Sequence, residues 1–391
     1  MADQGFSPPH NGANESETAH SLHRFGQVVL VLQGGGALGA YHGGVYEALH
    51  LAGVEPDWIV GTSIGAINGG LIAGNAKDVR LERIKRFWKL IEYEWPLQAA
   101  RWFPFVGQST ANLLTIVGGN PEFFKPNPYA PFALRTQTEP EHASFYSVEP
   151  LRRTLHRLID ADMFSRWPTR LTVGAAKVTT SEMVYFDSAE IPLRVDHIVA
   201  SGALPPAFPP VRIDGTLYWD GGIVSNTPLD IVLDEHRRRP VLVIEVQLWD
   251  AEGPEPRTIM EGLMREKDIR FSSRAETSIM RAKELHRVRM MVSKLLKRLP
   301  PEDMVEPELL RIASEGMDEV MHVVRLLAPR LSYDDQTKDI DFSQDGIAQR
   351  WAAGLRDMTE VLKAEPWNIC GDEMEGIVLH EAHAGEVMET R

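Results

Sequence analysis

The stretch that decides the fold is "QVVLVLQGGGALGAYHGGV", residues 27–45. Val28 to Leu32 form a continuous apolar run, which predicts a buried strand of a parallel sheet. A glycine-rich turn follows, and the apolar residues after it recur every three or four positions until Gly53. That spacing predicts a helix ending at the glycine. A strand, a tight turn and a helix in this order indicate an α/β fold.

The glycine run in this turn has two interpretations. Gly34-x-Gly36-x-x-Gly39 after a strand is the dinucleotide-binding fingerprint. The same glycines could instead present backbone N–H groups to an oxyanion in a hydrolase. The dinucleotide interpretation requires an acidic residue at the end of the next strand, where it would bind a ribose hydroxyl. The nearest candidate, Asp57, precedes that strand and would lie at the wrong end of the sheet. The dinucleotide interpretation is therefore the weaker one.

A second strand, turn and helix follow in "DWIVGTSIGAINGGLIAG", residues 57–74. Gly61-x-Ser63-x-Gly65 in this context is typical of a nucleophile elbow. The residues two positions before and after the serine must be nearly free of side chain, because a Cβ there would collide with the adjoining strand or helix. Ser63 is therefore the candidate nucleophile, and the N–H groups of Gly34, Gly35 and Gly36 are the candidate oxyanion donors.

A serine nucleophile needs a base, and none of the 13 histidines has a persuasive placement. Asp220 is better placed, because it ends the second strand of a predicted hairpin and Gly221 and Gly222 after it allow close backbone approach. The alternative is that Asp220 only caps a turn. A free aspartate has a pKa of about 3.9, so partial burial must raise the pKa if Asp220 is the base.

Three segments together resemble the patatin-like phospholipases, in order and with compatible spacing. They are "LVLQGGGALGAYHGGV", "IVGTSIGAING" and "ASGALPPAFPPVRIDGTLYWDGGIVSNTPL", and the resemblance covers about residues 28–250. It implies a three-layer α/β/α sandwich with a mainly parallel central sheet. The charged C-terminal part looks like an extension found in a bacterial subgroup.

The resemblance also implies roles for individual residues. By motif, Ser63 matches the nucleophile and Asp220 the aspartate of a Ser-Asp dyad that works without a catalytic histidine. The supporting glycines by motif are Gly34, Gly35 and Gly36 in the oxyanion loop, and Gly39, Gly61, Gly65, Gly221 and Gly222 around it. Leu38 departs from the pattern, because many members have Lys or Arg in this loop.

The reaction implied is acyl transfer to Ser63 and release of the acid by water, with no cofactor or metal. The substrate implied is a phospholipid or another acyl ester of lipid. An esterase or thioesterase acting on smaller or polymeric acyl substrates is the alternative. A lipid-associated protein without turnover is a third interpretation, which the intact serine, aspartate and glycines argue against.

The pattern along the chain predicts four parts. Residues 1–26 are polar and predict a disordered leader, and 27–250 form the hydrolase domain. Within it, the aromatic-rich stretch 96–133 predicts a lid or acyl-binding segment, or alternatively a satellite core. Residues 251–391 predict a charged helical extension with no further strand of comparable strength.

Composition and charge limit which partners and which cellular location the sequence favours. The net charge of −14 argues against nucleic-acid binding. No secretory signal or membrane-spanning stretch is visible, and the single cysteine, Cys370, fits a reducing compartment, so a cytoplasmic location is expected. Residues 278–300 predict a basic amphipathic helix, which either packs on the core or rests peripherally on an anionic membrane. Nothing in the sequence indicates the oligomeric state.

Overall fold

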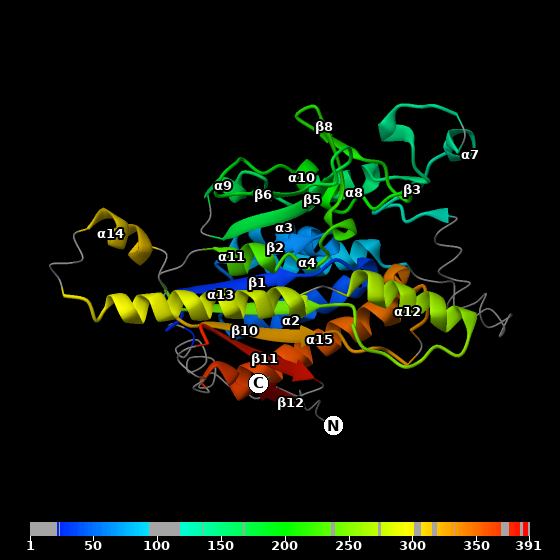
Figure 1. Ribbon diagram of the computed structural model, residues 1–391. Coiled ribbons are helices and arrows are strands. Elements are labelled where there is room, and N and C mark those ends of the chain that lie inside the picture. The colour runs from blue at the N-terminus through cyan, green and yellow to red at the C-terminus, as the bar shows by residue number, and fades with distance from the viewer. Residues whose placement is uncertain are drawn as a thin grey trace, which may run out of the picture.

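Parallel strands form the centre of one large sheet (Figure 1). β1 (Gln27–Leu32) lies between β2 (Trp58–Thr62) and β9 (Val241–Gln247), and β10 (Met321–Leu327) and β11 (Ile377–His383) continue beyond β9. In this computed structural model, the described residues are 22, 24–93, 118–134, 136–166, 169–235, 239–272, 275–300, 306–314, 319–332, 334–368, 375–383 and 386–389.

Antiparallel strands complete the sheet on both sides. β5 (Arg170–Lys177) is parallel to β2, whereas β6 (Met183–Asp187), β8 (Thr216–Asp220), β7 (Val211–Ile213) and β12 (Glu386–Glu389) pair antiparallel to their neighbours. The order is β12-β11-β10-β9-β1-β2-β5-β8-β7, with β6 also paired to β5. A separate small sheet pairs β3 (Lys125–Pro126) with β4 (Tyr146–Ser147).

Helices cover both faces of the sheet. Successive side chains of a strand point to opposite faces, and the central strands carry apolar side chains on both. Leu30 and Leu32 belong to the larger apolar cluster, and Val29 and Val31 belong to the smaller one. The larger cluster includes residues of α2 (Ala40–Leu51), α3 (Ile64–Ala73), α4 (Lys77–Ile91), α8 (Glu149–Leu158), α10 (Val195–Ser201) and α15 (Gln344–Ala364). The smaller cluster lies beneath α11 (Asp230–Asp234) and α13 (Ala275–Leu296).

This arrangement is the predicted three-layer α/β/α sandwich with a mainly parallel sheet. In the described part of the chain, the other helices are α7 (Ala130–Ala133), α9 (Met163–Arg166), α12 (Ile259–Phe271) and α14 (Pro307–Ser314), with 3-10 turns η1 (Gly36–Gly39), η2 (Pro140–His142), η3 (Gly221–Ile223), η5 (Lys338–Ile340) and η6 (Pro366–Asn368). The predicted hairpin turn is confirmed, because Asp214 and Gly215 both have positive φ between β7 and β8.

The expectation that the chain beyond residue 250 contains no further strand of comparable strength is wrong. β10 is almost wholly buried beside β9, and β11 and β12 extend the same sheet. Arg325 in the middle of β10 hides the strand from a search for apolar runs, yet its guanidinium pairs with Glu245 of β9 at 3.0 Å. The charged residue that interrupts the apolar pattern is therefore one partner of a buried ion pair within a continuous strand.

Two other predictions fall partly outside the described residues. Residues 1–21 of the expected leader are not described, but Leu22 and Phe25 are buried, so the fold begins before Gln27. Of the aromatic stretch 96–133, residues 96–117, with Trp102, Phe103 and Phe105, lie outside the description. Phe123 and Phe124 are buried, and Tyr129 is exposed.

Candidate active site

Ser63 occupies a strained turn between β2 and α3. Its φ of 56° and ψ of −123° lie in a region that residues with a Cβ rarely adopt. A Cβ on Gly61 would lie 2.5 Å from the carbonyl carbon of Gly65, and a Cβ on Gly65 would lie 2.1 Å from the Leu32 carbonyl oxygen. Both glycines are required for the reason that the sequence suggests. The Ser63 N–H donates to Ser201 Oγ at 3.0 Å, which helps to fix the turn.

Sheet register brings Asp220 to this serine. On β5, Gly174 is opposite Thr62 of β2, and the next residue, Ala175, is opposite Asp220 of β8. β6 occupies the other edge of β5 along these residues, so β2 and β8 meet end to end on one edge. The carboxyl end of β8 therefore lies beside the carboxyl end of β2, and Ser63 directly follows β2.

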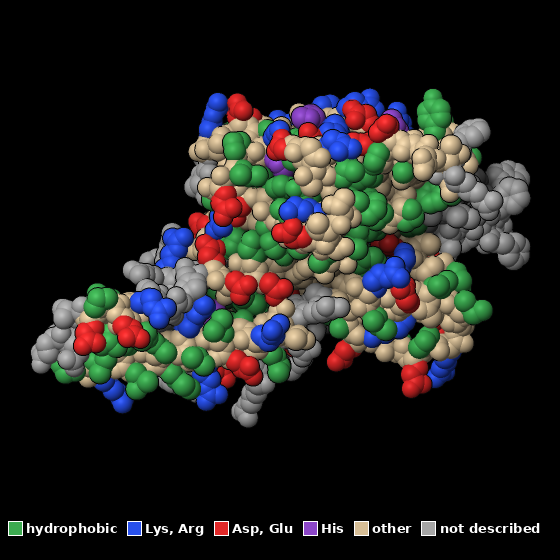
Figure 2. Space-filling model, turned by 45° about the horizontal axis from the view of Figure 1, so that its top comes forward, with side chains coloured by type: hydrophobic (Ala, Val, Ile, Leu, Met, Phe, Trp, Pro, Cys, Tyr) green, Lys and Arg blue, Asp and Glu red, His purple; other side chains and the backbone are tan. Residues whose placement is uncertain are grey.

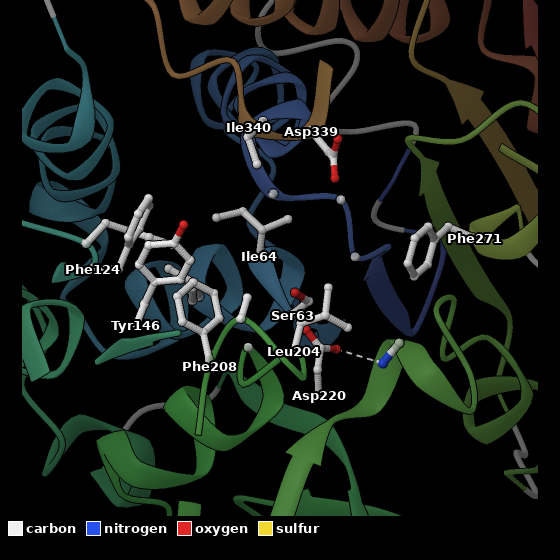
Figure 3. A pocket seen from close by; sticks show the side chains of 18 of the residues that line it. Ser63, Ile64, Phe124, Tyr146, Leu204, Phe208, Asp220, Phe271, Asp339 and Ile340 are labelled. Carbon is white, nitrogen blue, oxygen red and sulfur yellow. Dashed lines mark hydrogen bonds between the residues drawn. The ribbon is translucent and has the colours of Figure 1, made fainter. Parts of the chain in front are cut away.

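The Asp220 carboxylate is buried and lies beside the Ser63 side chain. Its Oδ1 accepts the Gly222 N–H at 2.7 Å. Burial raises the pKa of Asp220 from 3.8 to about 7, although the neighbouring Ser63 hydroxyl and the Gly222 N–H oppose the shift. An aspartate with this pKa accepts a proton far more readily than an exposed one. Figure 3 shows Ser63 and Asp220 side by side at the base of a pocket.

The glycine loop approaches the serine closely. A Cβ on Gly34 would lie 3.1 Å from Ser63 Cβ and 2.2 Å from Asn226 Oδ1. The Gly34 N–H already donates to the Asn226 carbonyl at 3.1 Å, so it is not a free oxyanion donor. Among the described residues, no hydrogen bond occupies the N–H of Gly35 or Gly36.

The remaining motif glycines permit close packing. A Cβ on Gly39 would lie 2.5 Å from Ile64 Cγ1, which joins the glycine loop to the elbow helix. A Cβ on Gly221 would lie 2.6 Å from the Gly174 carbonyl oxygen, and one on Gly222 would lie 3.1 Å from Asp220 Oδ1. These two glycines let the chain turn tightly against β5, so that the Gly222 N–H can donate to the carboxylate.

A cavity of about 400 Å³ opens above the serine and aspartate. One wall is aromatic and comes from separate parts of the chain: Phe123, Phe124, Tyr146, Phe208 and Phe342. Its rings pack on one another, with the centroids of Phe124 and Tyr146 5.0 Å apart. Phe271 lies on the opposite side of the pocket in Figure 3, with Asp339 and Ile340 at another edge.

The C-terminal part of the chain also lines this cavity, which the sequence did not indicate. Asp339 and Ile340 come from η5, and the Asp339 carbonyl oxygen would lie 2.2 Å from a Cβ on Gly36, whose φ is +55°. Phe271 ends α12, and its carbonyl accepts hydrogen bonds from the side chains of Asn226 at 2.9 Å and Gln33 at 3.2 Å. No motif or regular spacing in the sequence marks Phe271, Asp339 or Ile340. They reach the site only because of how α12 and η5 pack in the folded chain.

Leu38 is buried on η1 and is not among the residues that line the large cavity. It borders a separate cavity of about 20 Å³ with the cationic side chains of Arg330, Lys338 and Arg350. The cations nearest this part of the loop therefore belong to the C-terminal segment.

The described histidines do not enter the site. His42 is buried on α2 beside Asn68, and burial lowers its pKa to about 3. His286 contacts the Leu233 carbonyl at 3.1 Å on the other face of the sheet, and none of the histidines lines the cavity. Within the described parts of the chain, no group of three or more His, Cys, Asp or Glu side chains is arranged to hold a metal ion.

Comparison with known proteins places the chain in a family. The family model described as "Patatin-like phospholipase" matches residues 30–233, more than half of the chain, and a second model, described as "Patatin phospholipase", matches residues 269–373. The chain belongs to the patatin-like phospholipase family, whose members are lipid acyl hydrolases.

Individual relatives match over part of their length. The chain is 32% identical over 205 residues to "Patatin-like phospholipase domain-containing protein ZK370.4" of Caenorhabditis elegans, covering 52% of this chain and 12% of that protein. It is 27% identical over 247 residues to "Lysophospholipase NTE1" of Mycosarcoma maydis, covering 63% of this chain and 11% of that protein. The crystal structure of VipD from Legionella pneumophila aligns over 86% of this chain and 67% of that chain, with 16% identity and a TM-score of 0.37.

Proposed function

We propose that the chain is a serine acyl hydrolase of lipid esters that uses Ser63 as nucleophile and Asp220 as general base. The observation that carries the proposal is the contact between these two side chains, with Ser63 on a strained elbow and Asp220 buried with its pKa raised to about 7. Family membership supports the same class of reaction.

In the proposed reaction, Ser63 Oγ attacks the ester carbonyl carbon and its proton passes to the Asp220 carboxylate. The carbonyl oxygen becomes an oxyanion, and the N–H groups of Gly35 and Gly36 stabilise it. Collapse expels the alcohol, which takes the proton from Asp220, and leaves an acyl-serine. Water then attacks the acyl-serine, Asp220 takes the water proton and returns it to Ser63, and the free acid leaves.

The shape of the cavity supports a long-chain acyl substrate. Its volume of about 400 Å³ lies within the usual range of about 300–1,000 Å³ for ligand pockets. The aromatic wall formed by Phe124, Tyr146 and Phe208 offers apolar surface to an acyl chain beside Ser63 (Figure 3). We therefore propose phospholipid or lysophospholipid esters as substrates, in preference to short-chain esters or thioesters.

A panel of phospholipids, lysophospholipids, short-chain esters and acyl thioesters tests this proposal against wild type, Ser63→Ala and Asp220→Asn. Both variants are expected to lose hydrolysis by at least about 10³-fold while remaining folded, because each removes a group that reacts. A fluorophosphonate probe is expected to label Ser63 in wild type. Full activity in Ser63→Ala would end the assignment, and a preference for short esters or thioesters would select the alternative substrate class.

Two control variants match these changes. Ser181 also has a positive φ, 59°, but lies in an exposed turn, so Ser181→Ala controls for replacing a strained serine. Asp214→Asn changes an exposed aspartate of the β7–β8 hairpin. Both are expected to keep wild-type hydrolysis and fluorophosphonate labelling.

A further inference from the structure

Helix α13 presents two apolar faces, and only one of them is covered. Ile279, Ala282, His286 and Met290 recur every three or four residues and are buried. Ile279 and Ala282 belong to the smaller apolar cluster with α11, and His286 contacts the Leu233 carbonyl. This packing confirms one of the two predictions for residues 278–300. The other face of the helix is a separate surface.

The second face, which we call the outer face, is exposed. Its apolar residues are Met280, Leu285, Val288, Met291 and Leu295, of which Val288 is 55% and Leu295 63% exposed. These positions lie on the side of the helix turned away from the buried stripe, because a residue advances about 100° around a helix. In Figure 1, the C-terminal part of α13, together with α14, projects beyond the sheet.

Basic side chains accompany the apolar residues on the outer face. Arg281 and Arg287 are exposed there, and Arg298 is exposed in the turn that follows the helix. Among the described residues no ion pair involves any of them. Residues 275–299 hold seven Lys or Arg against two Glu, in a chain with a net charge of −14. Figure 2 shows apolar side chains along this projecting arm, with basic and some acidic side chains between them. An arginine-bearing apolar face complements a surface that is both apolar and anionic.

The N-terminal end of α13 lies close to the active-site wall. Phe271, the last residue of α12, lines the cavity, and α13 begins four residues later at Ala275. At about 3.3–3.6 Å for each extended residue, the start of α13 lies within about 15 Å of that wall. If α13 bound to a surface such as a membrane, the active-site cavity would lie close to that surface.

We propose that the outer face of α13 docks the protein on an anionic lipid bilayer. The apolar residues enter the acyl boundary, and Arg281, Arg287 and Arg298 pair with lipid phosphates. Docking goes beyond the proposed hydrolysis and does not require Ser63 or Asp220. No helix in the described part of the chain is long and apolar enough to cross a bilayer, so the proposal concerns adsorption to the surface.

Co-sedimentation of the full chain with vesicles tests the proposal. Wild type is expected to bind vesicles of phosphatidylcholine mixed with phosphatidylglycerol, and to bind pure phosphatidylcholine much less. Arg281→Gln/Arg287→Gln/Arg298→Gln is expected to lose about fivefold of the partition coefficient for each arginine on anionic vesicles. Val288→Ser/Leu295→Ser is expected to lose binding to both vesicles. Removing residues 257 onward is not an informative variant, because it also deletes β10, β11 and α15.

A charge-matched control is Lys77→Gln/Arg86→Gln/Arg153→Gln, which removes three exposed cations from α4 and α8. This variant is expected to bind vesicles as wild type does. The α13 variants and the charge-matched control are expected to hydrolyse a soluble short-chain ester at the wild-type rate. Ser63→Ala is expected to bind vesicles normally without hydrolysis, so failure of docking and failure of hydrolysis are distinguishable. Equal vesicle binding by wild type and both α13 variants overturns the proposal. The proposal is also overturned if sedimentation velocity shows a dimer that Leu295→Ser dissociates and wild type does not bind vesicles.

Discussion

Ser63 and Asp220 are each held in a state that is unfavourable outside this fold. A non-glycine residue at φ 56° and ψ −123° costs about 1–3 kcal/mol, and a buried carboxylate loses its hydration. Hydrogen bonds partly offset both costs: the Ser63 N–H donates to Ser201 Oγ, and the Gly222 N–H donates to the Asp220 carboxylate. Such costs are typical of reacting groups that the surrounding structure holds ready.

The first prediction concerns the pH dependence of hydrolysis. Asp220 must be ionised to accept the Ser63 proton, and burial raises its pKa to about 7. We expect kcat/KM on a soluble ester to rise about tenfold per pH unit below pH 7 and to level off above it. Asp214→Asn is expected to leave this profile unchanged, since Asp214 is exposed in the hairpin turn. A flat profile between pH 5 and 8 would contradict the role of Asp220 as base.

The same pKa predicts a change in stability. Between about pH 4 and 7 the folded state holds a proton on Asp220 that the unfolded chain has released, so the contribution of Asp220 to stability falls as pH rises through this window. Asp220→Asn keeps the shape of the side chain without the charge. We therefore expect the variant to have a higher Tm than wild type at pH 8, and a much smaller difference at pH 4, measured by calorimetry. A lower Tm than wild type at pH 8 would contradict the burial argument.

At the scale of elements, α12 connects the glycine loop with η5. Its last residue, Phe271, accepts hydrogen bonds from Asn226 and Gln33 beside the glycine loop. One turn earlier, Asp268 is fully buried and binds Lys338 Nζ at 2.6 Å and Arg330 at 2.8 Å. Since Asp339, the next residue after Lys338, contacts Gly36, these ion pairs fix the position of the segment against which Gly36 packs.

Replacing Asp268 by Asn is expected to loosen that segment. The change leaves the buried Lys338 without its carboxylate partner, and breaking such a pair costs about 3–5 kcal/mol. We expect a loss of unfolding free energy in this range by urea titration, and a fall in kcat with KM nearly unchanged for the remaining folded enzyme. Lys363→Gln removes an exposed pair with Glu360 and is expected to cost less than about 1 kcal/mol. Wild-type kcat in Asp268→Asn would show that η5 does not position the glycine loop.

The elements that sequence could predict are those with local signals. Strands around Leu30, Ile59 and Ile244 are apolar runs, and the elbow at Ser63 is fixed by glycines that a Cβ would block. Asp220 could be proposed as the base from its place at a strand end before two glycines, and the resemblance supported the pairing with Ser63. Its contact with Ser63 depends on the register on β5, which joins residues far apart in the chain. Phe271 and Asp339 could not be predicted, because their role depends on helix and turn placement rather than on any pattern.

At the scale of the molecule, the region that the second family model matches is part of the central sheet and core. β10 pairs along its whole length with β9, and α15 packs directly on α2, the helix that follows the glycine loop. A Cβ on Gly354 of α15 would lie 2.1 Å from the Tyr41 carbonyl oxygen, and one on Gly44 of α2 would lie 1.9 Å from the Trp351 carbonyl oxygen. The two helices touch backbone to backbone, so α15 supports the glycine loop through α2.

The last prediction tests whether this contact belongs to the same cooperative unit as the site. Gly354→Ala places a methyl group against rigid backbone, and overpacking of this kind costs about 1–3 kcal/mol. Gly262→Ala is the matched control, because Gly262 also lies within a helix, α12, but a Cβ there meets nothing within 4 Å. The control is expected to gain about 0.5–1 kcal/mol from helix propensity alone. In thermal unfolding followed by circular dichroism and by residual hydrolysis, Gly354→Ala should lower both midpoints together. Separate midpoints would mean that α15 and the glycine loop unfold independently.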